Sequence, residues 1–167
     1  MQLNFSDYIN DAIRILVLLN GTQKYKSLKM TENKIKLYDY YLKFPHTMMK
    51  DFSPQHTDRE NFDEYYAFFH WQPDLIRYRQ SINYLISKGF VEKSAVDKST
   101  FFQITDLGIE ALNSIDNPYK SKLTDLTEAC IPHIQKLSDS KIEESIRKKT
   151  NIFSRKGGLT DETKNAD

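Results

Sequence analysis

The sequence predicts a mainly helical fold that carries one small β-hairpin, an α+β class of domain. Apolar residues recur at three- and four-residue steps through most of the chain, as a buried helix face requires. This pattern breaks at Gly89, and two short runs with strand-like composition follow at 90–94 and 100–104. Helical spacing resumes after Thr105. The hairpin is therefore expected between two helices.

Two helices are expected in the first part of the chain, at 7–19 and 32–44. Ser6 and Thr31 can cap them, and Pro45 ends the second one. The first of these helices is apolar on most of its sides, which predicts a position at the centre of the fold or between the core and a partner.

Apolar side chains in residues 46–72 follow no regular helical or strand spacing. This predicts an inserted loop with a short helix near 61–69. The insert ends in the aromatic run "YYAFFHWQP". Two interpretations stay open, a flap packed over the core and an exposed surface for a partner. The candidate partner-binding residues are the aromatic side chains of this run and of the second helix: Tyr38, Tyr41, Tyr65, Tyr66, Phe68, Phe69 and Trp71.

Around the hairpin, Pro73 is expected to open a helix that a left-handed Gly89 ends, and Thr105 is expected to cap a helix at 106–115. Strand alternation predicts core-facing side chains at Val91, Phe102 and Ile104, with Lys93 and Gln103 facing outward.

The C-terminal part predicts two further helices. Pro118 can open the first, which Pro132 should kink or split. Ser140 and Glu143 form a capping box for the second, expected to end near Lys149. Beyond it the chain is polar and is expected to be disordered.

The order of helix, cap glycine, hairpin and helix is that of a winged helix-turn-helix domain with extra C-terminal helices. In such domains the helix before the hairpin enters the DNA major groove and the hairpin is the wing. The sequence therefore predicts a winged-helix domain at 1–117 with the aromatic insert at 46–72, a helical extension at 118–150, and a disordered polar tail at 151–167.

Candidate DNA contacts follow from this order. Arg and Gln can contact base edges from the helix, and Lys can contact phosphates from the wing or from the stretch "IRKKTNIFSRK". These candidates are Arg77, Gln80, Lys88, Lys93, Lys98, Arg147, Lys148, Lys149, Arg155 and Lys156. A solvated polar helix face, and a basic helix end favoured by its dipole, are the alternative interpretations.

Composition limits the classes of function. The 167 residues carry 24 basic and 23 acidic side chains, so attraction of the whole chain to nucleic acid is weak. Ten Tyr and ten Phe suit either a large aromatic core or surfaces covered by partners. Without a long apolar run or a secretory signal, and with one cysteine, we expect a cytoplasmic protein that does not contact membranes.

Catalytic chemistry is not expected. The four histidines are scattered, Cys130 lies on an apolar helix stripe, and "SRKGGL" places its glycines on the wrong side of the lysine for a phosphate loop. We therefore predict no enzymatic activity, no metal site, no cofactor and no small-molecule substrate.

Several segments carry a resemblance to a known family: "NDAIRILVLL", "KIKLYDYYLKFP", "FFHWQPD", "SINYLISKGFVE" and "FFQITDLGIEALNSIDNPYKSKL". Together they resemble the middle component of bacterial ABC-three-component systems, the group that includes Lamassu-type antiphage and antiplasmid defence. The insert is longer and more polar than this resemblance leads us to expect, and the basic stretch after Ile146 matches no familiar pattern.

The resemblance implies a non-catalytic winged-helix subunit that bridges an SMC-like ABC ATPase and an effector, often a nuclease. Contact with DNA would then be indirect. The alternative is a winged-helix transcription regulator that binds DNA directly. The run "LISKGFV" resembles the pattern Leu-x-x-x-Gly-Phe/Leu-Val/Ile that precedes the wing in bacterial regulators of that kind, and Thr105 with Gly108 resembles the Thr-x-x-Gly stretch that follows it.

Overall fold

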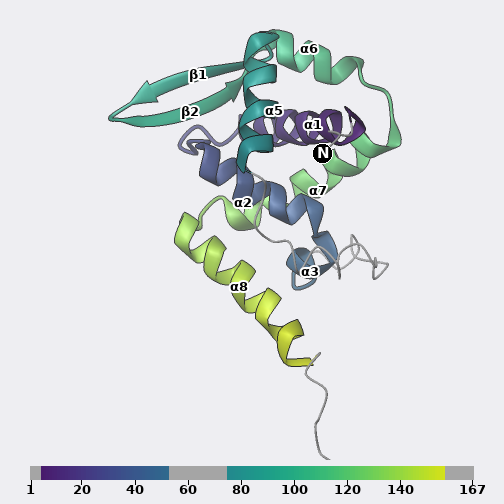
Figure 1. Ribbon diagram of the computed structural model, residues 1–167, viewed down its shortest axis with the longest axis vertical. Helices are drawn as coiled ribbons and strands as arrows, with labels where there is room; N and C mark the ends of the chain where they lie inside the picture. Colours follow the sequence, from purple (N-terminus) through teal and green to yellow (C-terminus); the bar gives the residue numbers. More distant parts are fainter. Residues whose placement is uncertain (1–4, 53–74, 157–167) are drawn as a thin grey trace, which may run out of the picture.

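A computed structural model describes residues 5–52 and 75–156 (Figure 1). Side chains are described for 8–52 and 75–149. The fold is mainly helical with a small two-stranded antiparallel sheet, which confirms the predicted class. The elements are α1 Phe5–Thr22, α2 Glu32–Lys43, α3 Pro45–Met49, α5 Leu75–Ser87, β1 Val91–Val96, β2 Ser99–Ile104, α6 Asp106–Ser114, α7 Pro118–Ile134 and α8 Asp139–Lys156.

Helix α1 forms the centre of the fold. Every side chain from 11 to 19 is buried, because α7, α5, α2, α6 and β2 all pack around it (Figure 1). Ile15 and Val17, which lie on opposite sides of the helix, are 1% and 3% exposed. The apolar character of α1 on most of its sides is thus explained by its central position.

The C-terminal helices differ from the expectation in three details. Helix α7 continues through Pro132 to Ile134, so the proline does not split it. The cap of α8 is Ser138, whose Oγ accepts the Lys141 N–H. Ser140, the predicted cap, lies inside α8. Helix α8 also runs to Lys156, so its backbone includes the first residues of the predicted tail.

Both C-terminal helices pack on the earlier ones. Helix α7 lies along α1 and also contacts α2. Helix α8 packs its Ile142 and Ile146, each 0% exposed, onto the α2 and α3 side of the molecule (Figure 1). These helices are therefore part of the same hydrophobic core as α1 and α2.

The hairpin turns in two residues. Asp97 and Lys98 have φ values of 48° and 65°, the conformation of a tight type I′ turn between twisted strands. The strands are accordingly longer than predicted and the turn shorter. Val91, Phe102 and Ile104 are buried as expected.

Lys93 and Gln103 are exposed as expected, but Lys93 does not lie on the outward face of the sheet. Lys93 lies opposite Phe102 in the strand register, and residues opposite each other share a sheet face. Lys93 is exposed because the hairpin extends beyond the helical body at that point (Figure 1).

The base of the hairpin is tied to α6 by the Thr-x-x-Gly pattern. The Thr105 hydroxyl donates to the Gly89 carbonyl at 2.6 Å and accepts the Gly108 N–H at 3.0 Å, which caps α6 as predicted. Gly89 adopts a left-handed φ of 72°, also as predicted. A Cβ at Gly108 would lie 2.2 Å from the Phe90 carbonyl oxygen, so only glycine allows this close approach.

We predict that Gly108→Ala lowers the free energy of unfolding by about 2 kcal/mol, although alanine is the better helix former, because the added methyl meets backbone. Gly89→Ala should cost about 1 kcal/mol through its left-handed φ alone. Urea denaturation measures both, with exposed Glu110→Ala as a near-neutral control. Equal stability of the Gly108 and Glu110 variants would show that α6 can move away from the hairpin.

Candidate interaction surfaces

A buried cluster of charged side chains connects four helices. The Arg14 guanidinium on α1 donates to Asp39 on α2 at 2.7 Å, to the Tyr119 hydroxyl on α7 at 3.0 Å, and to Asp11 one turn earlier on α1. Arg14 is 7% exposed and Asp39 is 1% exposed. Burial opposes the charge on Arg14, but Asp39, Tyr119 and Asp11 outweigh it and raise the pKa of Arg14, so the guanidinium stays charged.

Two more cations complete this cluster from its edges. Arg77 on α5 donates to the second oxygen of Asp11. The Lys43 ammonium lies 3.1 Å from the second oxygen of Asp39 and 5.0 Å from the centre of the Tyr78 ring on α5. The cluster therefore fixes α5 against both α1 and α2.

The predicted DNA-reading face of α5 is partly occupied by α1. Arg77 is held by Asp11. The Tyr8 hydroxyl donates to the Gln80 carbonyl at 2.9 Å, and the Tyr8 and Tyr84 rings meet edge to face at 5.4 Å. Arg77, a candidate for base contact, thus holds two helices of the chain together.

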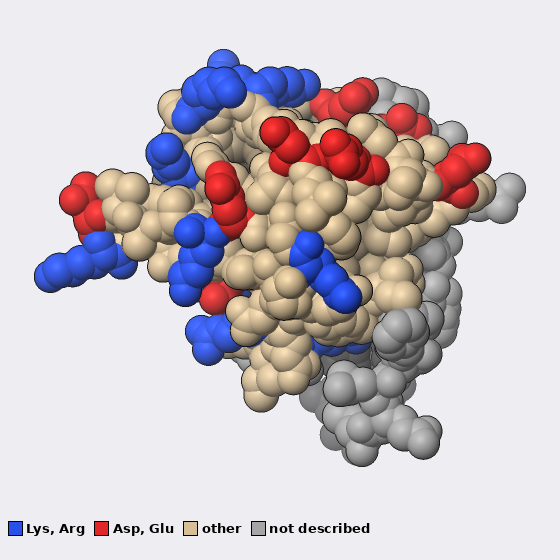
Figure 2. All heavy atoms as spheres, turned by 90° about the horizontal axis from the view of Figure 1, so that it is seen from above, with Lys and Arg blue, Asp and Glu red and all other residues tan. Residues whose placement is uncertain are grey.

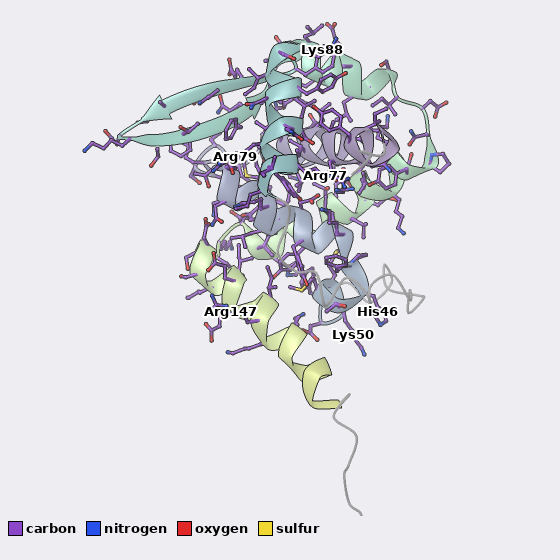
Figure 3. All side chains as sticks on the ribbon, in the orientation of Figure 1. His46, Lys50, Arg77, Arg79, Lys88 and Arg147 are labelled. Atoms are coloured by element: carbon purple, nitrogen blue, oxygen red, sulfur yellow. The ribbon has the colours of Figure 1, made fainter. Side chains whose placement is uncertain are left out.

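The other candidates on α5 lie apart from one another. Lys88 lies at the end of α5 that leads to the hairpin, away from Arg77, and its ammonium is 5.6 Å from the Tyr84 ring centre (Figure 3). The Gln80 side chain is exposed. Arg79, which the sequence analysis did not select, is exposed and pairs with Glu32 at 3.1 Å. The described part of α5 therefore presents few cations to a nucleic acid.

The charges on the hairpin offset one another. Lys93 and Lys98 are exposed, and so are Glu92 and Asp97 beside them. Figure 2, which looks onto the hairpin and α6, shows acidic groups directly beside basic ones on the projecting part at the left. This face has no broad field of one sign.

The predicted basic stretch lies at the other end of the molecule, along α8 (Figure 3). Lys148 pairs with Glu144 at 2.8 Å, and Lys149 pairs with Asp51 at 2.8 Å and donates to the Met48 carbonyl at 2.9 Å. Arg147 is exposed. The Lys149 hydrogen bond lowers the pKa of Asp51. The structure therefore does not bring this stretch together with the hairpin.

Arg155 and Lys156 lie within α8, but their side chains are outside the described part.

The candidate aromatic residues fall into two groups. Tyr38 and Tyr41 are 0% and 2% exposed, and the Tyr38 hydroxyl donates to the Ile134 carbonyl at 3.4 Å. Burial raises the pKa of both phenols. Because their helix is covered by α7 and α8, these two side chains belong to the core, which corrects their selection as partner contacts. The remaining candidates, Tyr65, Tyr66, Phe68, Phe69 and Trp71, lie outside the described residues.

A groove lies between the hairpin and the segment 22–30, which connects α1 to α2. Its volume is about 330 Å³. Half-buried Tyr25, Leu28 and Phe101 contribute to its lining, with exposed Lys26 and Lys29 beside them. The spacing of lysines around Tyr25 in "QKYKSLK" is the signal in the sequence that could have pointed to this groove.

Within the described ranges, no group of three or more His, Cys, Asp or Glu side chains could hold a metal ion. No described helix combines the length and the apolar character that crossing a membrane requires.

A protein-family model, ABC-three component (ABC-3C) system Middle Component 2, matches residues 5–156. The chain belongs to this family. The matched residues include the insert at 46–72 and the whole basic stretch to Lys156, the two parts that departed from the expected resemblance. No curated protein and no solved structure matches the chain. As a member, the chain is a middle component of a multi-subunit system. This agrees with the expected role of an accessory subunit in a defence system.

We predict that Arg14→Met lowers the free energy of unfolding by about 3–5 kcal/mol, because Asp11 and Asp39 then remain buried without the cation between them. Chemical denaturation measures the loss. Lys148→Met, which removes the exposed pair with Glu144, should change stability by less than about 1 kcal/mol. The double variant Arg14→Met/Asp39→Leu should recover part of the loss, and a neutral Arg14→Met would contradict a buried ionic cluster.

We predict that Cys130 does not react with a thiol reagent in the native protein at pH 8. Its side chain is 1% exposed and burial raises the pKa of the thiol, so little thiolate is present. Absorbance after adding a disulfide reagent measures the reaction. Full reaction is expected in denaturant, and Lys122→Cys on the exposed face of α7 should react at once in a Cys130→Ala background. Rapid native labelling of Cys130 would show that α7 opens.

Proposed function

We propose that the chain is a non-catalytic winged-helix accessory subunit that bridges an SMC-like ABC ATPase and an effector, such as a nuclease, in an antiphage or antiplasmid defence complex. One observation carries most of the argument: the side of α5 that would read DNA is held by α1 through Asp11–Arg77 and Tyr8–Tyr84. A winged helix arranged in this way is better suited to contact proteins than to bind DNA on its own.

The order of elements supports the winged-helix assignment. Helix α5 ends at left-handed Gly89, the hairpin follows, and α6 closes it. In addition, the Phe102 N–H on β2 donates to the Met30 carbonyl at 2.9 Å. The segment between α1 and α2 thus meets β2 as a third strand does in winged-helix sheets. We take 1–117 as the winged-helix domain and 118–150 as an extension built onto its α1 and α2.

Exposed apolar side chains favour protein partners. Ile76 on α5, Val96 beside the hairpin turn and Leu107 on α6 are 70%, 55% and 51% exposed. Large apolar groups on several separate elements suit a subunit that more than one partner covers. The near-neutral net charge of +1 agrees with this, because a subunit held by proteins needs no long-range attraction to DNA.

Co-expression with the ABC ATPase and the effector of the same system tests the proposal. We expect a stable ternary complex in size-exclusion chromatography, and loss of the contact between ATPase and effector when this chain is omitted. We also expect no nuclease or nucleotide hydrolysis activity from the isolated chain. A monomer that binds neither protein would contradict the proposal.

A winged-helix DNA-binding transcription regulator is the second candidate function. Exposed Lys88, Lys93 and Lys98 at the hairpin end of the molecule favour it. A discrete, salt-sensitive footprint of the isolated chain on its own promoter would support this alternative over the bridging subunit.

We predict that the isolated chain binds duplex DNA weakly and without sequence preference, because few cations face outward from α5 and carboxylates accompany those on the wing. Fluorescence anisotropy at several salt concentrations measures the affinity. Lys93→Glu/Lys98→Glu should lower it no more than about threefold relative to Lys122→Glu/Lys136→Glu, the same charge change on α7 and the loop after it. Nanomolar, sequence-selective binding would overturn the protein-bridging role.

A further inference from the structure

The groove between the 22–30 segment and the hairpin carries a charge imbalance. Lys24, Lys26 and Lys29 are exposed along its connecting segment, and Glu92 is the one carboxylate in its described lining. None of the three lysines forms an ion pair with a described carboxylate. Lys26 and Lys29 line the groove, and exposed Lys24 lies beside it on the same segment, so three ammonium groups are available to an acidic ligand.

Two of these ammonium groups lie over aromatic rings. The Lys29 nitrogen is 6.0 Å from the centre of the Phe101 ring on β2, and the Lys24 nitrogen is 5.4 Å from the centre of the Tyr25 ring. A cation over a ring occupies the face that a nucleic-acid base would use for stacking. The lining thus favours carboxylates placed between lysines over stacked bases.

The backbone of β2 offers a second recognition element. Alternate residues of a strand direct their N–H groups to the same edge, so the Thr100 N–H faces the edge at which the Phe102 N–H meets Met30. The chain leaves this edge for α2 at Glu32. In the described part, Thr100 has no backbone partner outside the hairpin. An extended peptide can bond to such an edge, as in other cases of strand addition.

We propose that this groove binds an extended acidic segment of a partner subunit, which lies along β2 and places carboxylates between Lys24, Lys26 and Lys29. The segment's main chain continues the strand contact that Met30 begins, and its apolar side chains pack on Leu28 and Phe101. This inference rests on the proposed function, since it assumes a partner protein, and it adds the place and the chemistry of one contact.

The test compares two triple variants that carry the same charge change. Lys24→Glu/Lys26→Glu/Lys29→Glu reverses the groove, and Lys122→Glu/Lys136→Glu/Lys141→Glu reverses exposed lysines elsewhere. Biolayer interferometry measures the affinity of each for the purified ATPase and for the purified effector. We expect the groove variant to bind one of them at least about tenfold more weakly than wild type, and the control variant to change less than about threefold.

Hydrogen–deuterium exchange of the complex gives a second readout that does not depend on a variant folding. We expect residues 22–30 and 99–104 to gain protection when the partner binds, and the exposed face of α7 to keep its exchange rate. Equal affinity of the groove variant and wild type, or unchanged exchange at both segments, overturns the proposal while leaving the bridging function intact.

Two further outcomes separate the alternatives. Failure of wild type to bind either protein rejects the bridging function, and the groove proposal with it. If the groove variant keeps its protein partners but loses affinity for single-stranded DNA, the groove binds a nucleic acid and the peptide proposal is wrong.

Discussion

The ion pair between Arg14 and Asp39 is the constraint on which the arrangement of the helices depends. A guanidinium and a carboxylate buried to this degree each require a partner, because an unpaired buried charge costs several kcal/mol. Arg14 satisfies Asp39, Asp11 and Tyr119 together, and Asp11 in turn holds Arg77. Hydrophobic packing is tolerant of small shifts, whereas these directional bonds fix how α1, α2, α5 and α7 lie against one another.

This constraint explains why two cations of α5 are directed to carboxylates of the chain itself. In a DNA-binding winged helix, cations on the recognition helix face outward to meet phosphates and base edges. Here Arg77 turns inward to a carboxylate of α1 and Arg79 pairs with Glu32 of α2, so the cations of α5 act within the chain. Moving Arg77 to a phosphate would leave one oxygen of a nearly buried Asp11 without its cation. Any use of Arg77 in binding DNA would therefore weaken the buried cluster around Asp11.

Local signals in the sequence predicted the local structure well. Thr31, Thr105 and Gly89 each act through bonds or a backbone angle within a few residues, and each was located before the structure was known. Alternation along the strands also placed Val91, Phe102 and Ile104 correctly, because the core covers that part of the hairpin.

The failures came from contacts between distant residues. Tyr38 and Tyr41 looked like surface aromatics because α2 alone shows two apolar faces, and α7 and α8 cover them from far along the chain. Arg77 and Asp11 are 66 residues apart, so their pairing is fixed only once α5 packs on α1. The one available hint was a charged pair, Asp11 and Arg14, spaced one turn apart in an otherwise apolar helix.

The same reasoning indicates that the groups still available for a partner lie around the hairpin. Arg77 of α5 is paired with buried Asp11, and Lys149 of α8 is bonded to Asp51 and Met48. Around the hairpin, by contrast, Lys24, Lys26 and Lys29 have no described counter-charge, and among the described residues the β2 backbone bonds to Met30 through Phe102 and leaves Thr100 without such a partner. The hairpin is held rigidly at its base by Thr105 and Gly108, so a ligand bound along β2 would be fixed relative to α6 and α1. A hairpin that is rigid at its base and has a strand edge with a free backbone donor at Thr100 in the described part is suited to position a second protein on the helical body.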